Sequence, residues 1–413
     1  MRRGGSAAVR RCGSAAVWPH WMLMMSACAG SLPPGSIAPR ALCAGPPCAI
    51  DSLTQLVDSA VAAGAAPGAV LAVSVGGKRY LYGTGRIALD DPARPDGHTI
   101  YDLASLTKVV ATTSLAMLAV SEGKIELDAP VQRYLAAFRG RGKEQVTIRH
   151  LLTHSSGLPA DRALWRLTPD RDSALGLVNA TPLDTLPGQR MVYSDVGAMV
   201  LGEVIERVYG ARLDRLARGK VLGPLGMSST GFRPRAGILS RVAATEYDTA
   251  WRKRVVRGEV HDEKAAWLGG VAGHAGLFGS AVDLLTFGEW TLAVMRSGSQ
   301  GPNGEPPEKP AGPSVPQTVL REFARRQNVV AGSSRALGWD TPSQGSSAGI
   351  RLDSTSYGHT GFTGTSIWID PTRELVLVLL TNRVHPTRNN PRIGPFRIAV
   401  ANRIAALLAE RGR

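Results

Sequence analysis

The sequence predicts an α/β fold of the α+β type. One antiparallel sheet would be built from both ends of the chain and flanked by the first and last helices, with a mostly helical lobe between these ends. Strand patterns lie near residues 69–83 and again between residues 356 and 381, whereas the stretch from about 105 to 295 is mainly helical. A cleft between the sheet and the helical lobe is the expected place for an active site.

The first elements of the predicted domain are a helix and a β-hairpin. Residues 51–64 have the apolar spacing of a helix, with Asp51 as the expected N-cap. Residues 69–75 and 79–83 have strand composition, and Gly76-Gly77 between them is typical of a two-residue hairpin turn.

Helices dominate the middle of the chain, and strands return after it. Residues 104–122 are an apolar stretch that Gly123 ends, and residues 196–208 carry one apolar face. Residues 297–316 are rich in proline and glycine and are predicted as an exposed loop. The remaining predicted elements are strands over 356–362, 365–369 and 375–381, a turn over 370–373 and a helix over 392–410. We expect one domain over 51–413, with a sheet lobe of about 51–104 and 330–413 and a helical lobe of about 105–295.

The N-terminal end is typical of an exported protein. Residues 1–29 combine a basic start, an apolar patch and a small-residue cleavage site, Ala27-Cys28-Ala29. Cys28 also fits a lipoprotein signal and would then carry a lipid anchor, whereas a start at Met22 or Met24 would leave the protein in the cytoplasm. Residues 30–50 are predicted as a tether. We expect a periplasmic or cell-envelope location.

Composition excludes several classes of protein. The net charge is +15, but the basic residues form no stripe with interleaved aromatic residues, so we expect an Arg-rich surface and no nucleic-acid partner. The four cysteines all precede residue 49, so the folded body needs no disulfide and has no thiolate nucleophile. We expect a monomer that acts on a small-molecule or peptidoglycan-derived substrate.

Ser105 and Lys108 form an S-x-x-K element at the start of the apolar helix. Their spacing places both side chains on one helical face, within hydrogen-bond reach. A partly desolvated lysine loses proton affinity and can act as a base. A serine next to such a lysine is an arrangement that activates the serine as a nucleophile. The alternative is a serine near a helix start and a lysine that reaches the surface. A charge within an apolar helix is costly when unpaired, which argues against that alternative.

Two later elements complete a pattern. Tyr193-Ser194-Asp195 precedes the helix over 196–208, and His359-Thr360-Gly361 lies on a predicted strand. In this order the three elements resemble the superfamily of serine β-lactamases and penicillin-binding proteins, in the branch with class C β-lactamases, D-Ala-D-Ala carboxypeptidases and esterases. Residues 147–159 and 268–278 resemble further segments of that branch, and the resemblance runs from about residue 50 to 410.

The resemblance implies a β-lactamase/transpeptidase-like fold and a role for each residue. Ser105 would attack the acyl carbon, and Lys108 and Tyr193 would share the acid and base work. The backbone N–H groups of Ser105 and Phe362 would form the oxyanion hole. The expected substrate-side residues are Asp195, His359, Thr360 and Gly361, the glycine allowing the substrate backbone to approach.

Two departures from typical β-lactamases shape the expected activity. His359 stands where a lysine is usual, and a neutral imidazole holds a carboxylate less strongly than an ammonium does. Asp195 stands where an asparagine is usual, and an ionised carboxylate cannot donate a hydrogen bond. We therefore expect an esterase or D,D-peptidase-like hydrolase that forms an acyl-enzyme on Ser105. The alternatives are a β-lactamase proper and a penicillin- or peptidoglycan-binding protein without turnover.

Other polar clusters are expected to be structural. Ser155-Ser156 lacks the surroundings of a lipase nucleophile, and His154 and His274 lie in turn-like contexts. His261-Asp262-Glu263 lacks a spaced second histidine and is placed by the resemblance on a loop at the cleft rim, so we expect no metal. Residues 269–279 are rich in glycine but lack the lysine of a phosphate loop, and we expect no cofactor.

Overall fold

The computed structural model describes residues 50–163, 170–297 and 310–411. The predicted export signal with Cys28, nearly all of the tether and most of the 297–316 loop lie outside these residues. Within the described part of the chain, no helix combines the length and apolar character that a membrane crossing requires.

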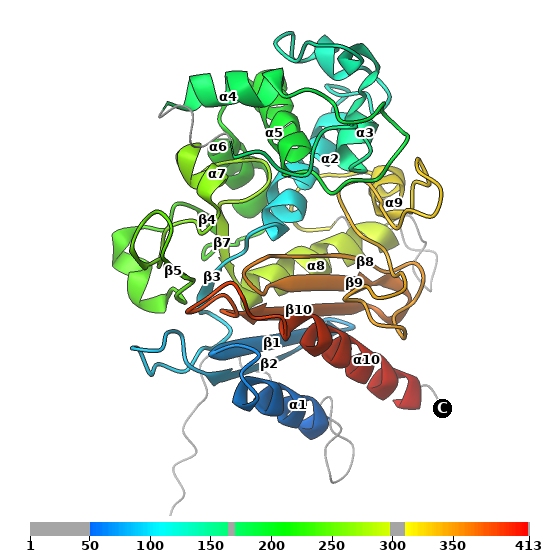
Figure 1. Ribbon diagram of the computed structural model, residues 1–413. Coiled ribbons are helices and arrows are strands. Elements are labelled where there is room, and N and C mark those ends of the chain that lie inside the picture. The colour runs from blue at the N-terminus through cyan, green and yellow to red at the C-terminus, as the bar shows by residue number, and fades with distance from the viewer. Residues whose placement is uncertain (1–49, 164–169, 298–309, 412–413) are drawn as a thin grey trace, which may run out of the picture. The chain divides into compact units, whose positions relative to one another are not determined.

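A five-stranded sheet joins the two ends of the described chain, as predicted. Its order is β2-β1-β10-β9-β8, and every neighbouring pair is antiparallel (Figure 1). The strands are β1 (Gly68–Val75), β2 (Lys78–Gly85), β8 (Tyr357–Thr360), β9 (Ser366–Asp370) and β10 (Leu375–Thr381). The predicted turn between β1 and β2 is confirmed, because Val75 pairs with Lys78 and both intervening glycines have positive φ.

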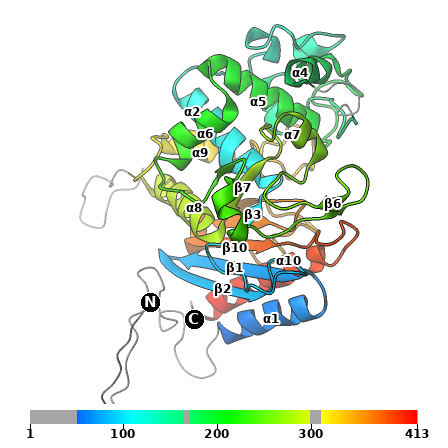
Figure 2. The ribbon, with the colours of Figure 1, turned by 90° about the vertical axis from the view of Figure 1, so that its left-hand side faces the viewer.

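Alternate side chains of β10 enter two different cores. Leu377 and Leu379 pack with α1 (Asp51–Ala62) and α10 (Ile393–Arg411), the first and last helices. Val376 and Val378 point to the opposite face, into the large core that contains α8 (Ala281–Arg296). Figure 2 shows α1 and α10 on one side of the sheet and α8 on the other. The strand is therefore apolar at nearly every position, since both of its faces are buried.

Helix α8 lies within the stretch that the sequence assigns to the helical lobe, yet it packs on the sheet. A β-carbon at Gly288 would lie 2.4 Å from the Val376 side chain, so this glycine permits the close approach of helix and strand. The sequence predicted Asp51 as the N-cap of α1, and this prediction is wrong. Ile50 holds that position, and Asp51 lies in the first turn, where its charge favours the helix dipole.

The helical lobe and the segments around it contain shorter elements. The helix predicted over 104–122 has a π-helical segment, Lys108–Thr113, where the Ser114 hydroxyl donates to the Val109 carbonyl five residues back. The α-helices are α2 (Ser114–Ser121), α3 (Ile148–Leu152), α4 (Arg171–Ala180), α5 (Asp195–Tyr209), α6 (Leu213–Ala217), α7 (Glu263–Trp267) and α9 (Gln317–Ala324). A second π-helical segment is Arg218–Leu222, and 3₁₀ segments are Val131–Arg133, Lys143–Gln145, Ala236–Arg241 and Pro371–Arg373. Small sheets pair β3 (Ile100–Asp102), β7 (Leu277–Ser280) and β4 (Gly231–Phe232), and β5 (Tyr247–Asp248) with β6 (Arg254–Val255).

Candidate active site

Ser105 lies at a tight turn between β3 and the central helix. The residue before it, Ala104, has a φ of 46°, which is uncommon for a residue with a side chain. The buried carboxyl group of Asp102 accepts the Ala104 N–H at 2.8 Å and the His261 N–H at 2.7 Å. These bonds fix the turn that presents Ser105 and tie it to the segment that precedes α7.

The ammonium group of Lys108 has three acceptors. Its Nζ atom donates to Ser105 Oγ at 3.0 Å, to Asp195 Oδ1 at 2.7 Å and to the His274 carbonyl at 3.1 Å. The predicted contact between Ser105 and Lys108 is therefore confirmed. The Lys108 side chain is only 4% exposed, so these three partners replace the water that a lysine normally binds.

The protonation of Lys108 differs from the sequence-based expectation. Burial acts to lower the pKa of Lys108, but the charges of Asp195 and Tyr193 and their hydrogen bonds outweigh it, and the net shift is upward. The expectation of a lysine with reduced proton affinity is wrong, because that expectation considered burial alone. An ammonium has no lone pair, so Lys108 is the donor in its bond to Ser105 Oγ, and the serine proton must point to another acceptor.

Asp195 binds two lysines. It opens helix α5, whose N-cap is Ser194, and Ser194 Oγ accepts the Gly197 N–H at 2.9 Å. One carboxylate oxygen of Asp195 faces Lys108, and the other lies 3.1 Å from Lys264 Nζ. Burial acts to raise the pKa of Asp195, but Lys108, His274 and Lys264 hold it well below the usual range. Asp195 is thus an ionised anchor for two cations, and it also lines a cavity onto which Ser105 opens.

Tyr193 lies between two histidine rings and two cations. Its ring centroid is 4.5 Å from that of His154 and 5.8 Å from that of His359. Lys108 Nζ lies 4.8 Å from the ring centroid, and the guanidinium carbon of Arg335 lies 5.2 Å from it. His154 also accepts the Ser194 N–H at 3.1 Å through Nδ1, so it supports the Tyr193 segment as a structural residue.

The third element of the pattern faces the same site. His359 donates from Nδ1 to the Thr360 carbonyl at 2.8 Å, and its buried Nε2 atom has no partner among the described residues. A β-carbon at Gly361 would lie 2.5 Å from the Leu103 carbonyl, so the close approach there is to the chain's own backbone. Thr360 and Phe362 line the cavity that contains Ser105.

The turn over residues 361–365 is tied to the Ser105 turn. Thr365 Oγ1 donates to the Leu103 carbonyl at 3.0 Å, and Arg383 Nε donates to the Phe362 carbonyl at 2.9 Å. Within the described residues, no hydrogen bond uses the backbone N–H of Ser105 or of Phe362. Both predicted oxyanion donors are therefore available to a bound group.

Ser105 opens onto two cavities. One, of about 430 Å³, is lined by Ser105, Tyr193, Arg335, Asp340, Gly345, Ser347, His359, Thr360, Gly361, Phe362, Trp368, Arg383, Gly394, Arg397 and Ile398. The other, of about 260 Å³, is lined by the segment of residues 261–264 and by Asp161, Asp195, His274 and Arg388, among others. Three arginines and one carboxylate line the first cavity, which makes it strongly cationic, whereas the second is lined by four carboxylates, two histidines and two cations, Lys264 and Arg388.

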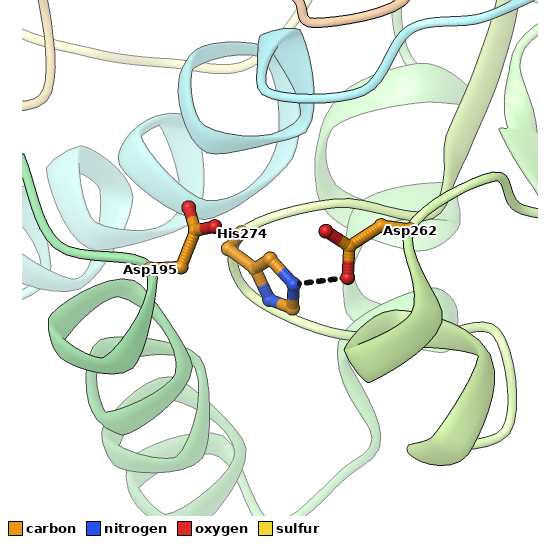
Figure 3. A group of neighbouring side chains, drawn as sticks. All are labelled: Asp195, Asp262 and His274. Carbon is orange, nitrogen blue, oxygen red and sulfur yellow. Dashed lines mark hydrogen bonds and ion pairs between the residues drawn. The ribbon is translucent and has the colours of Figure 1, made fainter. Parts of the chain in front are cut away.

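Figure 3 shows Asp195, Asp262 and His274 around one point, with His274 bonded to Asp262 at 2.9 Å. Each offers one possible metal-ligand atom, and these atoms lie within 4.8 Å of one another. However, Lys264 Nζ lies 3.1 Å from Asp195 and 3.7 Å from Asp262, and Lys108 also binds Asp195. Two ammonium groups already neutralise these carboxylates, so the geometry favours a paired charge cluster over a cation site.

Comparison with known proteins decides the family. A sequence profile of the Beta-lactamase family matches residues 53–402. The chain belongs to the Beta-lactamase family. A relative from Salmonella typhi named "Putative D-alanyl-D-alanine carboxypeptidase" is 33% identical over 340 residues, which cover 75% of this chain and 76% of the relative.

Solved structures show the same fold. A class C β-lactamase from Rhodobacter sphaeroides has a TM-score of 0.66 at 21% identity and covers 88% of this chain and 100% of its own. EstCE1, described as a hydrolase with promiscuous acyltransferase activity, has a TM-score of 0.65 at 21% identity, covering 85% and 98%. The predicted family and fold class are confirmed, and the protein is a serine hydrolase of the Beta-lactamase family.

Sequence reasoning missed two cations at the site. Lys264 directly follows His261-Asp262-Glu263, the segment that the sequence analysis considered as a metal ligand set. Its ion pairs with Asp161, Asp195 and Asp262 are visible only in the folded structure. Arg335 lies in a segment without any recognised motif. Ser155 and Ser156, which the sequence analysis judged structural, make local bonds, since the Ser155 hydroxyl bonds Thr153 and Ser156 Oγ accepts the Leu158 N–H. His274 and residues 261–263 instead line a cavity onto which Ser105 opens.

The buried histidines predict that stability falls at mildly acidic pH. Burial, together with the charges of Arg335 and Lys108, holds the pKa values of His154 and His359 well below 6.5. Below pH 6.5 the unfolded chain binds protons that the folded chain does not, so the free energy of unfolding falls as pH falls. We expect a loss of about 1 kcal/mol for each histidine between pH 7.5 and 5.5, measured by urea denaturation.

A variant pair checks the source of this pH dependence. His359→Asn removes one buried titrating group and should make the decline shallower, whereas His98→Asn, at an exposed histidine, should leave it as in the wild type. A free energy of unfolding that is equal at the two pH values would contradict the prediction.

Proposed function

We propose that the protein hydrolyses an ester or amide bond through an acyl-enzyme on Ser105, with esterase or D,D-peptidase-like activity. The observation that carries the proposal is the 3.0 Å bond from the buried Lys108 ammonium to Ser105 Oγ, at a turn that opens onto a cavity. The names of the carboxypeptidase relative and of EstCE1 support the same reaction class.

The proposed mechanism assigns the proton of Ser105 to Tyr193. Since Lys108 donates to Ser105 Oγ, the serine O–H is directed to another acceptor, and the Tyr193 hydroxyl already interacts with Lys108. Ser105 Oγ bonds to the acyl carbon and gives its proton to the Tyr193 oxygen, while Tyr193 gives its own hydroxyl proton to the leaving group as the bond from the acyl carbon to that group breaks. Tyr193 is neutral before and after this relay, and the Lys108 ammonium stabilises the negative charge that develops on the tyrosine oxygen during it. The N–H groups of Ser105 and Phe362 would hold the oxyanion. Water then releases the acyl group by the reverse proton path.

Two features rank this activity above a β-lactamase proper. The low pKa of His359 leaves the imidazole neutral, so it supplies no charge for a substrate carboxylate. Asp195 is ionised and both of its oxygens accept from lysines, so it has no hydrogen to donate to a substrate amide carbonyl. A small-molecule or peptidoglycan-derived substrate and a periplasmic or cell-envelope location are part of the proposal. The N-terminal sequence supports that location.

Covalent labelling tests the proposal directly. Incubation with a fluorophosphonate should add one adduct to the intact protein, and peptide mapping by mass spectrometry should place it on Ser105. A parallel incubation with a penicillin separates the alternatives, since a long-lived adduct favours a penicillin-binding protein and rapid product release a β-lactamase. An adduct at another residue, or none with either reagent, would contradict an acyl-enzyme on Ser105.

A further inference from the structure

Trp251 is a large aromatic side chain that the fold holds at the surface. It lies on the hairpin between β5 and β6 and is 43% exposed. The Asp248 carboxylate accepts the Trp251 N–H at 2.8 Å and the Arg252 N–H at 3.1 Å, which fixes the turn. The guanidinium carbon of Arg252, whose side chain is almost fully buried, lies 4.3 Å from the Trp251 ring centroid and supports one face of the indole. The exposed indole therefore has a fixed position.

A cavity of about 340 Å³ opens beside this indole and is called the Trp251 cavity below. The residues that give it its chemical character are Trp251, Phe278, Gly269, Gly270, Arg233 and Glu259. Both glycines have positive φ, and a β-carbon at Gly269 would meet no atom within 4 Å. The Trp251 cavity thus combines aromatic rings, backbone without side chains and two charged groups, which is a composition typical of small-ligand sites.

The two charged side chains of the Trp251 cavity already have counterions. Arg233 forms an ion pair with Asp214. Glu259 forms ion pairs with Arg252 and Arg254. Both side chains nevertheless remain partly exposed, so they can also bind a ligand. The cavity therefore offers hydrogen-bond donors and acceptors whose charges are balanced, which favours a neutral polar ligand over an ion.

A sugar ring matches this combination of groups. The C–H groups of a sugar form an apolar face, which packs on the negatively charged face of an indole. Its hydroxyl groups project from the edge of the ring and both donate and accept hydrogen bonds. A purely apolar ligand would cover Arg233 and Glu259 without replacing the water that these groups bind, which is costly.

The Trp251 cavity is next to the smaller of the two cavities onto which Ser105 opens. Glu259 and Val260 line the Trp251 cavity, and residues 261–264 line the smaller Ser105 cavity. Four residues of backbone span at most about 14 Å, so Glu259 and Glu263 lie within that distance of each other. One extended substrate molecule can therefore occupy both cavities.

We propose that the Trp251 cavity binds a neutral sugar ring, and that this ring belongs to a glycan attached to the substrate of Ser105. The substrate class is then an ester or amide that carries a glycan. This inference rests on the proposed function, because the same molecule must reach Ser105. It gives a ligand to residues that take no part in the acyl transfer itself.

Saturation-transfer NMR tests the sugar site. The probe is tri-N-acetylchitotriose, a neutral trimer of N-acetylglucosamine, and the wild type should transfer saturation to its ring protons. Trp251→Ala should lose this transfer, and Trp251→Phe should keep part of it. Circular dichroism shows that each variant is folded. A wild type without transfer, or a wild-type signal in Trp251→Ala, would overturn the sugar site.

Tyr247→Ala is the matched control. Tyr247 is 47% exposed on the same hairpin, but it is not among the described residues that line the Trp251 cavity, so this variant should keep the wild-type signal. The control also tests for a membrane surface, which exposed aromatic residues beside arginines can bind. Sedimentation with phosphatidylglycerol vesicles that both substitutions weaken, without saturation transfer to the sugar, would replace the sugar site by a membrane contact.

Protection of Ser105 from a fluorophosphonate connects the sugar to the substrate. A peptidoglycan disaccharide-pentapeptide should slow the labelling of wild type at a roughly tenfold lower concentration than the pentapeptide alone, and Trp251→Ala should remove this difference. Equal protection by the two ligands, or none by either, would overturn the link between the glycan and the substrate. A Ser105 that takes no fluorophosphonate would contradict the proposed function alone, because saturation transfer needs no chemistry at Ser105.

Discussion

Ser105→Ala is expected to lower the kcat of ester hydrolysis by about four to six orders of magnitude, the usual cost of removing a covalent nucleophile. The variant keeps Lys108, Tyr193 and both oxyanion donors, but no atom remains to bond the acyl carbon. Only slow attack by water within the preorganised site would persist. Steady-state hydrolysis of an aryl ester measures this loss, with enzyme concentrations high enough to detect the residual rate.

Ser156→Ala is the matched control for that variant. Ser156 lies in the Thr-His-Ser-Ser-Gly segment that superficially resembles a nucleophile motif, and the bond that its hydroxyl oxygen accepts among the described residues is from the Leu158 N–H at 3.3 Å. Its replacement should change kcat by no more than a few-fold. If Ser105→Ala hydrolysed the ester at the wild-type rate, or Ser156→Ala abolished turnover, the nucleophile would have to be sought elsewhere.

Lys108→Met is expected to lower kcat/KM by about a thousandfold. The variant removes the donor to Ser105 Oγ and the positive charge beside the Tyr193 ring, both of which the proposed proton transfer needs. Asp195 would keep Lys264 as its partner, so the carboxylate is not left without a cation. Ester hydrolysis at a temperature where circular dichroism shows a folded chain gives the measurement.

Lys264→Met distinguishes a catalytic role of Lys108 from a merely stabilising role in the ion pairs around Asp195. Both lysines bind Asp195, and both are buried, but only Lys108 contacts Ser105. Because Asp195 keeps the other lysine in each variant, both substitutions should destabilise the fold by a similar amount that is smaller than the roughly 3–5 kcal/mol of a fully unpaired buried charge. Lys264→Met should nevertheless retain kcat/KM within about tenfold. Equal losses of activity in the two variants would mean that Lys108 only holds the cluster together.

The main architecture was predictable from the sequence because its signals are local. The strand composition and turn residues of 69–83 and 356–381 predicted the strands of the sheet and the hairpin at Gly76-Gly77, and the structure confirms them. The three-residue spacing of Ser105 and Lys108 predicted their contact in the same way, since helical geometry alone sets it. The side of the sheet that α8 covers had no such local signal.

The sequence by itself thus determined the strands of the five-stranded sheet, the contact between Ser105 and Lys108 and the order of the three motif elements. Only the tertiary structure decided the charge state of the site. Lys108 stays protonated because Asp195, 87 residues away, lies 2.7 Å from its ammonium group. The Arg335 guanidinium lies over the Tyr193 ring because one β-bridge joins Arg335 to Asp340 and another joins Asp340 to Gly358 on β8. The physical reason is that the periodicity of helices and strands depends on neighbours in sequence. The pKa values and the unpaired hydrogen-bond donors of a site depend on distances between residues far apart in the chain, which only packing sets.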